Sequence, residues 1–179
     1  MYDVIVVGGG HAGVEASLAS ARIGMNTLLI TLTKENIASM PCNPSIGGPA
    51  KGVIVREIDA LGGQMGINTD ETYLQMKMLN TAKGPGVRCL RAQSDKLLYK
   101  RNMQKTLDDQ ENLTVLEGVV VSLVCENKEC KGVVLENGET ILSKIVILSF
   151  IFTTLLSRYS FANLLLVRSD KPVKNSSCV

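Results

Sequence analysis

The 179-residue sequence contains no tryptophan, a single histidine and few aromatic side chains, which make up 4% of its residues. Its five cysteines are odd in number, lie far apart and form no Cys-x-x-Cys pair. A zinc site or a disulfide scaffold is therefore excluded as the basis of the fold, because both need clustered ligands or paired thiols. We expect no metal site, and scattered cysteines favour a reducing, cytoplasmic setting.

Long apolar runs are also missing. The chain opens on Met1, Tyr2 and Asp3, without the basic segment and apolar stretch of a secretory signal. Residues 145–167 are rich in apolar side chains, but Ser, Thr, Arg and Asn interrupt them before the roughly 18–20 apolar residues that a membrane-spanning helix requires. We expect no membrane association.

The composition that remains is typical of a globular chain of one to one and a half domains. Apolar residues make up 45% and charged residues 20%, and the formal net charge is +2. A net charge this small neither favours nor excludes a nucleic acid, a membrane surface or an acidic substrate.

The first thirty residues have the pattern of a strand, a helix and a second strand. Residues 3–7 are a short β-branched run, which indicates a strand buried on both faces of a parallel sheet. Apolar residues then recur at helical spacing up to Ile23, with Gly24 as the expected end of the helix. Residues 26–31 read as the second strand, so the segment predicts a βαβ unit.

The sequence after residue 40 predicts a less regular succession of helices and strands. A segment rich in proline and glycine follows Met40, and the next helix is expected over residues 53–61. We predict two further helices and four strands, the last two joined by a turn at Asn137 and Gly138. The helices are residues 71–79 and 92–107, and the strands are residues 113–116, 119–125, 132–135 and 141–148.

A G-x-G-x-x-G motif lies between the first strand and the first helix, where it predicts a dinucleotide site. Gly8 permits the tight turn, Gly10 lets backbone amides approach a pyrophosphate, and Gly13 lets the helix lie close to the strand. The N-terminus of the helix then stabilises the negative charge of the diphosphate. The candidate cofactor-binding residues of this turn are Gly8, Gly9, Gly10, His11, Ala12 and Gly13.

The acidic residue that usually follows such a motif about 20 residues later is absent. Thr31 stands at the expected end of the second strand, and Glu35 lies a few residues beyond it. A hydroxyl cannot hold a ribose in the bidentate manner of a carboxylate. The motif alone therefore leaves the identity of the nucleotide open.

Several motifs in one order and spacing resemble a known family. They are the glycine turn with His11, the run from Cys42 to Gly48, Lys51-Gly52, residues 59–63, Lys83-Gly84-Pro85 and Arg91-Ala92-Gln93. Together these motifs are similar to the N-terminal part of the FAD-dependent tRNA wobble-uridine 5-carboxymethylaminomethyl modification enzymes, also called glucose-inhibited division protein A.

The resemblance implies an α/β, Rossmann-like FAD-binding fold of the type with two dinucleotide-binding domains (GR2), here its N-terminal lobe with a small β-rich portion. It implies FAD at the glycine turn and a backbone contact from Val120 to the adenine. A threonine at the end of the second strand is usual in the family, so Thr31 agrees with it. The similarity extends over residues 1–148, expected to be the FAD-binding domain. We interpret residues 149–179 as an unmatched tail of a truncated or frame-shifted form.

Cys42 is the candidate catalytic residue. Backbone amides of its glycine-rich surroundings could stabilise a thiolate, and the resemblance implies a role beside the flavin in one-carbon transfer to the uridine. An inert small apolar residue is the alternative. Lys51 either pairs with phosphate or flavin oxygens or is a solvated loop lysine.

Basic residues are concentrated between Lys83 and Lys105, a segment with a charge of +6, while the rest of the chain carries −4. Such segregation favours a polyanionic partner, which the resemblance implies to be tRNA. Tyr99 is the only ring in the segment available for stacking, so the contacts are expected to go to phosphates. A solvated helix face is the alternative. The candidate RNA-binding residues are Lys83, Arg88, Arg91, Lys100 and Arg101.

For an intact enzyme the resemblance implies NADH as reductant, a partner GTPase, a homodimer and addition of an aminomethyl or carboxymethylaminomethyl group to C5 of the wobble uridine. Two other functions stay open. One is a general FAD- or NAD-dependent oxidoreductase acting on a small molecule, and the other is an inactive fragment.

Overall fold

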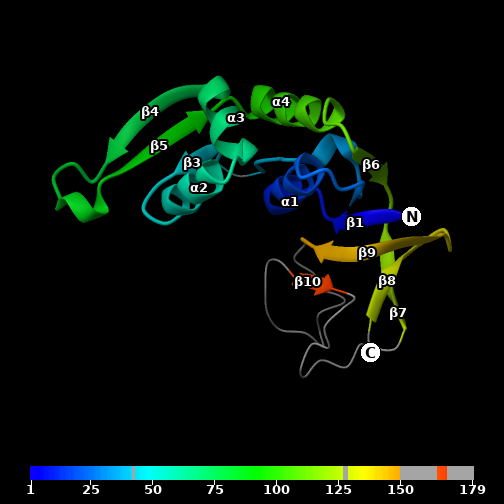
Figure 1. The fold of residues 1–179 in the computed structure, drawn as a ribbon. Helices are drawn as coiled ribbons and strands as arrows, with labels where there is room; N and C mark the ends of the chain where they lie inside the picture. The colour runs from blue at the N-terminus through cyan, green and yellow to red at the C-terminus, as the bar shows by residue number, and fades with distance from the viewer. Residues whose placement is uncertain (42, 127–128, 150–164, 169–179) are drawn as a thin grey trace. The chain divides into compact units, whose positions relative to one another are not determined.

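A computed structural model describes residues 1–41, 43–126 and 129–149, and the backbone of residues 165–168 (Figure 1). The chain divides into two compact units. The first unit comprises residues 1–37 and 107–179, and the second comprises residues 38–106. The second unit is thus inserted into the sequence of the first.

The first unit contains a parallel sheet in which the strand order is β6-β2-β1-β9. These strands are β6 (Leu113–Glu117), β2 (Thr27–Thr31), β1 (Tyr2–Val7) and β9 (Thr140–Leu148). Helix α1 (His11–Arg22) connects β1 to β2, and Gly24, at φ 88°, follows its end. The predicted βαβ unit is confirmed. The order of the strands in the sheet reverses at β1, which has β2 on one side and β9 on the other.

An antiparallel part extends the same sheet. Strand β7 (Val120–Glu126) pairs with β8 (Glu129–Leu135), which pairs with the first half of β9, and β10 (Leu165–Arg168) pairs with its second half. The predicted turn at Asn137 and Gly138 is confirmed. Gly138 has a φ of 84°, and its N–H donates to the Leu135 carbonyl at 2.9 Å.

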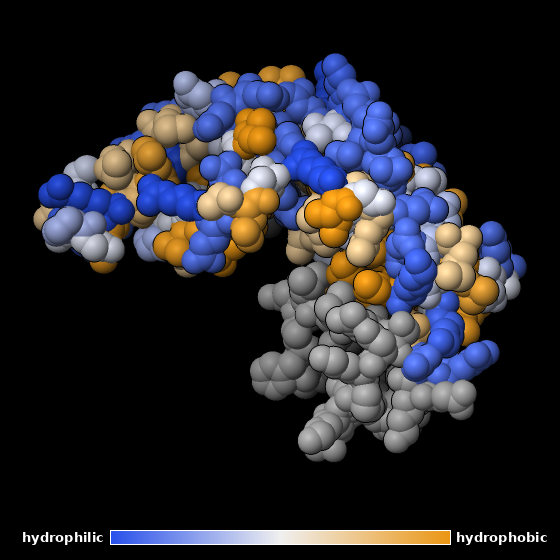
Figure 2. All heavy atoms as spheres, viewed as in Figure 1, coloured by the Kyte–Doolittle hydropathy of each residue, from blue (hydrophilic) through white to orange (hydrophobic). Residues whose placement is uncertain are grey.

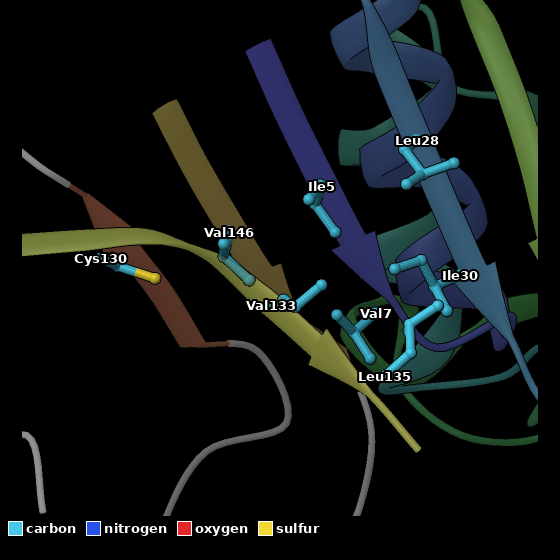
Figure 3. Packing of buried hydrophobic residues seen from close by; sticks show 8 residues of the cluster. All are labelled: Ile5, Val7, Leu28, Ile30, Cys130, Val133, Leu135 and Val146. Atoms are coloured by element: carbon cyan, nitrogen blue, oxygen red, sulfur yellow. The ribbon is translucent and has the colours of Figure 1, made fainter. Parts of the chain in front are cut away.

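The core of the first unit lies where the parallel strands meet this antiparallel part (Figure 3). Its side chains come from β1, β2, β8 and β9, and Ile5, Val133 and Val146 are fully buried. The cluster consists of Ile5, Val7, Leu28, Ile30, Cys130, Val133, Leu135 and Val146.

Near the amino end of β1 an ion pair ties this strand to β9. Lys144 donates to the Asp3 carboxylate at 2.6 Å. This hydrogen bond, with a second from the Asn26 N–H, lowers the pKa of Asp3 below its ordinary value.

The second unit is built on a three-stranded antiparallel sheet of order β3-β5-β4. The strands are β3 (Ser45–Gly47), β4 (Tyr73–Leu79) and β5 (Cys89–Ser94), and the helices are α2 (Lys51–Ala60), α3 (Gln64–Thr72) and α4 (Lys96–Asp108). The division between the units falls near the end of α4. Two short 3-10 helices, Lys34–Asn36 and Pro85–Val87, lie in connections of the first and second unit respectively.

The predicted helix over residues 71–79 is wrong. The helix there ends at Thr72, and residues 73–79 form β4. Leucine, methionine, glutamine and lysine favour helices locally, but Leu74, Met76 and Met78 also alternate along the chain, and pairing with β5 selects the strand.

The predicted helix over residues 92–107 is correct only in its later part. Residues 92–94 belong to β5, and α4 begins after Asp95. The Asp95 carboxylate accepts hydrogen bonds from the N–H groups of Leu97 and Leu98, both at 2.9 Å. Asp95 therefore caps the N-terminus of α4.

Replacing this cap should weaken the helix. Asp95→Ala is expected to lower the free energy of unfolding by about 1 kcal/mol, since two N–H groups lose their acceptor. Urea denaturation followed by circular dichroism measures the change. Asp108→Ala, at the other end of the same helix, is the matched control and should not destabilise, because it removes a negative charge from the helix C-terminus. Equal losses in the two variants would contradict the capping role.

Candidate functional site

The turn between β1 and α1 has the geometry that the glycine motif predicts. Gly8 adopts φ 113°, a conformation that a side chain disfavours, and its N–H donates to the Ile30 carbonyl at 2.8 Å. The helix begins at His11, and its N-cap residue is Gly10, which has no side chain to accept a hydrogen bond from the first N–H groups. The helix contains no acidic residue in its first turn. Its N-terminus is therefore not occupied by a carboxylate of its own.

Packing explains two of the remaining glycines. A Cβ on Gly13 would lie 1.9 Å from the Gly8 carbonyl oxygen, so only glycine allows this approach of helix to strand. A Cβ on Gly9 would lie 2.6 Å from Thr31 Oγ1. The residue at the end of β2 thus constrains the turn directly.

Gly10 differs from both. A Cβ at this position would meet no atom of the described protein within 4 Å, and its φ of −71° suits any residue. Packing within the chain therefore does not require glycine here. An open space beside backbone amides at a helix N-terminus fits the pyrophosphate of a dinucleotide.

Around the end of β2, hydrogen bonds join three segments of the first unit. Thr31 is buried, and its carbonyl accepts from the Gly118 N–H at 2.8 Å. The Glu117 carboxylate accepts from the Lys34 N–H at 2.6 Å. Glu35 is exposed in the adjoining short helix. The ends of β2 and β6 are therefore fixed beside the glycine turn.

Val120 also lies in the first unit, at the start of β7. It is partly buried and packs against the core cluster that includes Val7 and Ile30, the residues with which β1 and β2 approach the turn. His11 is partly buried and Ala12 is exposed, both in the first turn of α1. The structure thus gathers the candidate cofactor residues in one unit.

The candidate RNA-binding residues all lie in the second unit. Lys83 and Arg88 are exposed in the connection between β4 and β5, and Arg91 lies on β5, where it donates to Ser45 Oγ at 3.0 Å. Lys100 and Arg101 lie on α4. The candidates therefore divide between a hairpin and a helix.

Tyr99 does not provide a stacking ring. It is 0% exposed, and its carbonyl accepts from the Asn68 side chain of α3 at 2.9 Å. This expectation was wrong because a helical pattern with many basic residues does not show which positions face the interior.

Cys42 lies outside the described residues, and its role stays a prediction. Lys51 is exposed at the start of α2. Sequence reasoning missed Lys77, which the wrong helix over residues 71–79 concealed. The available signal was the alternation of the apolar residues Met76 and Met78 on either side of Lys77.

Within residues 1–41, 43–126 and 129–149, no group of three or more His, Cys, Asp or Glu side chains could hold a metal ion. In the same part of the chain, no helix has both the length and the apolar character needed to cross a membrane.

Comparison with known proteins adds three findings. Residues 3–151 match the family model described as glucose inhibited division protein A. A tRNA uridine 5-carboxymethylaminomethyl modification enzyme, MnmG of Geobacillus kaustophilus, is 64% identical over 148 residues, which are 83% of this chain and 24% of that protein. The corresponding Bacillus subtilis protein is 57% identical over the same coverage. The chain spans about a quarter of the length of these curated relatives.

Solved structures give the same result for the fold. The structure of Aquifex aeolicus GidA in its form I crystal matches with a TM-score of 0.80 and 48% identity, over 83% of this chain and 25% of that one. A probable FAD-dependent monooxygenase of Pseudomonas aeruginosa matches with a TM-score of 0.53 and 13% identity, over 81% of this chain and 41% of that one. The second likeness concerns the fold alone.

Proposed function

Because the chain belongs to the glucose-inhibited division protein A family, we propose that it is the N-terminal FAD-binding part of an enzyme that modifies the wobble uridine of tRNA. The observation that carries this proposal is the glycine turn, in which packing accounts for Gly9 and Gly13 but leaves Gly10 beside open space. The relatives from Geobacillus and Bacillus, which are named as tRNA uridine modification enzymes, support the substrate.

In this proposal the first unit holds the cofactor. The pyrophosphate of FAD lies against the turn formed by Gly8, Gly9, Gly10, His11, Ala12 and Gly13, and Val120 contacts the adenine through its backbone. Thr31 fits this arrangement because its side chain lies against Gly9 rather than reaching outward as a ribose-binding carboxylate would.

When bound, FAD supplies the redox chemistry of the reaction, and the protein supplies binding and orientation. The N-terminus of α1 stabilises the diphosphate charge, and the fixed ends of β1 and β2 set the position of the turn. We assign Cys42 as the nucleophile that acts on the uridine.

The second unit engages the tRNA in this proposal. Lys83, Arg88, Arg91, Lys100 and Arg101 neutralise backbone phosphates, a contribution that weakens as salt concentration rises. NADH as reductant, a GTPase partner, a homodimer and action in the cytoplasm complete the proposal for the intact enzyme.

Titration with FAD tests the cofactor assignment. The 179-residue chain is expected to take up FAD saturably, with quenching of flavin fluorescence. Gly10→Val should weaken the affinity about 100-fold, since the side chain blocks roughly two charge-assisted hydrogen bonds from backbone amides to the diphosphate.

The matched control is Gly84→Val, in the connection between β4 and β5, because its φ of −57° suits any residue and a Cβ there would meet nothing within 4 Å. This variant should leave the affinity for FAD unchanged. No saturable uptake by the unchanged chain, or equal uptake by the Gly10→Val variant, would overturn the assignment.

A further inference from the structure

The three-stranded sheet of the second unit has two chemically different faces. Because side chains alternate along a strand, the register places two polar pairs on one face, Gln75 with Gln93 and Lys77 with Arg91, together with Ser45 of β3. The pair of Leu79 and Cys89 ends this face beside the connection between β4 and β5. The opposite face carries Ile46, Met76, Met78, Leu90 and Ala92. We call the first of these the polar face.

Two cations lie directly opposite each other on the polar face. Lys77 pairs with Arg91 in the β4–β5 register, and like charges at such a position destabilise a sheet. None of the three strands contributes an acidic side chain. Within the described residues, no ion pair is formed by either cation.

Arg91 is nevertheless held in place. It is partly buried, its guanidinium donates to Ser45 Oγ at 3.0 Å, and its strand is paired on both sides. Lys77 is exposed on the neighbouring strand. The Arg91 guanidinium thus presents several N–H donors from a fixed position, and the Lys77 ammonium adds a positive charge on a flexible side chain. This combination matches the chemistry of a phosphate group.

The charge continues along the hairpin. Lys83 and Arg88 are exposed in the connection that joins β4 to β5, and Figure 2 shows strongly hydrophilic residues along this hairpin, at the left of the view. The hairpin thus carries one cation on each strand and two in the connection between them. Several cations on one hairpin suit a chain of phosphates better than a single anion.

We propose that the polar face binds the backbone of RNA, with Lys77 and Arg91 on either side of one phosphodiester. Gln75 and Gln93, paired with each other in the register, offer amide donors and acceptors to the adjoining sugar and phosphate oxygens. This inference rests on the proposed tRNA substrate and makes the sheet the main RNA contact, with Lys100 and Arg101 of α4 contributing less.

A charge reversal separates this role from a structural one. Lys77→Glu removes the like-charge contact and creates a cross-strand ion pair with Arg91, so the unfolding midpoint should rise. The affinity for an unmodified tRNA transcript, measured by fluorescence anisotropy on the 179-residue chain, should fall about tenfold. The slope of log affinity against log salt between about 50 and 200 mM should become shallower by about 1.

Lys105→Glu, on the exposed side of α4, is the matched control, because it makes the same change in charge outside the sheet. Its effect should stay below about twofold, the size of a long-range field effect in salt. A loss equal to that of Lys77→Glu would overturn the inference.

Two further outcomes would also overturn it. One is full affinity in Lys77→Glu combined with loss in a Lys100→Gln, Arg101→Gln double variant, which would place the RNA on α4. The other is competition by polyglutamate as effective as that by tRNA, which would indicate an acidic protein partner. Absence of tRNA binding by the unchanged chain would contradict the tRNA substrate itself, whereas the FAD titration would still stand on its own.

Discussion

Gly13→Ala is expected to lower the free energy of unfolding by about 3 kcal/mol, at the upper end of the cost of overpacking. The added Cβ would lie 1.9 Å from the Gly8 carbonyl oxygen. The Gly8 oxygen belongs to the backbone, and the added Cβ is bonded directly to the backbone of α1. Neither atom can therefore move away without separating α1 from β1. In an exposed helix the same substitution would stabilise by about 1 kcal/mol, which makes the sign of the effect diagnostic. Urea denaturation measures it.

Gly10→Ala is the control for this result. Its Cβ would meet nothing within 4 Å, so its unfolding free energy should stay within about 0.5 kcal/mol of the unchanged chain. Similar stability in the two variants would show that the helix does not lie against the strand as described here.

Tyr99→Ala is expected to cost 3–5 kcal/mol, roughly the range for removing a large buried ring. Tyr99 is 0% exposed and stands among the largest fully buried side chains. The loss should appear in thermal and urea unfolding of the chain in the absence of any ligand. A residue whose purpose was to stack on a base would instead show normal stability and weakened RNA affinity.

Leu97→Ala on the same helix provides the comparison. Leu97 is 61% exposed, so its truncation should change the unfolding free energy by no more than about 0.5 kcal/mol. If Tyr99→Ala were equally mild, the burial of the ring would be contradicted.

The sequence predicted the parts of the fold that local patterns determine. The strand of residues 3–7, the glycine turn and the helix from His11 each carry their own signal in consecutive residues. The turn at Asn137 and Gly138 did so as well, because its conformation needs only the residues within it. The position of the candidate cofactor site follows from these elements.

What the sequence concealed depends on contacts between distant residues. Strand β4 is a strand because β5 lies beside it, and its own residues are good helix formers. The contact between Gly9 and Thr31 requires two parallel strands in register. The pairing of Lys77 with Arg91 likewise exists only in the folded hairpin, so the polar face was not foreseeable.

The insertion of the second unit separates β2 from its partner strand β6 by a long stretch of chain. Lys34 and Glu117, which join the ends of these neighbouring strands, are 83 residues apart. Closing so long a connection is slow while it is unstructured, because non-local pairing must first overcome its entropy. Prior collapse of residues 38–106 would shorten the effective length of this connection, so we expect the inserted unit to form before β6 pairs with β2.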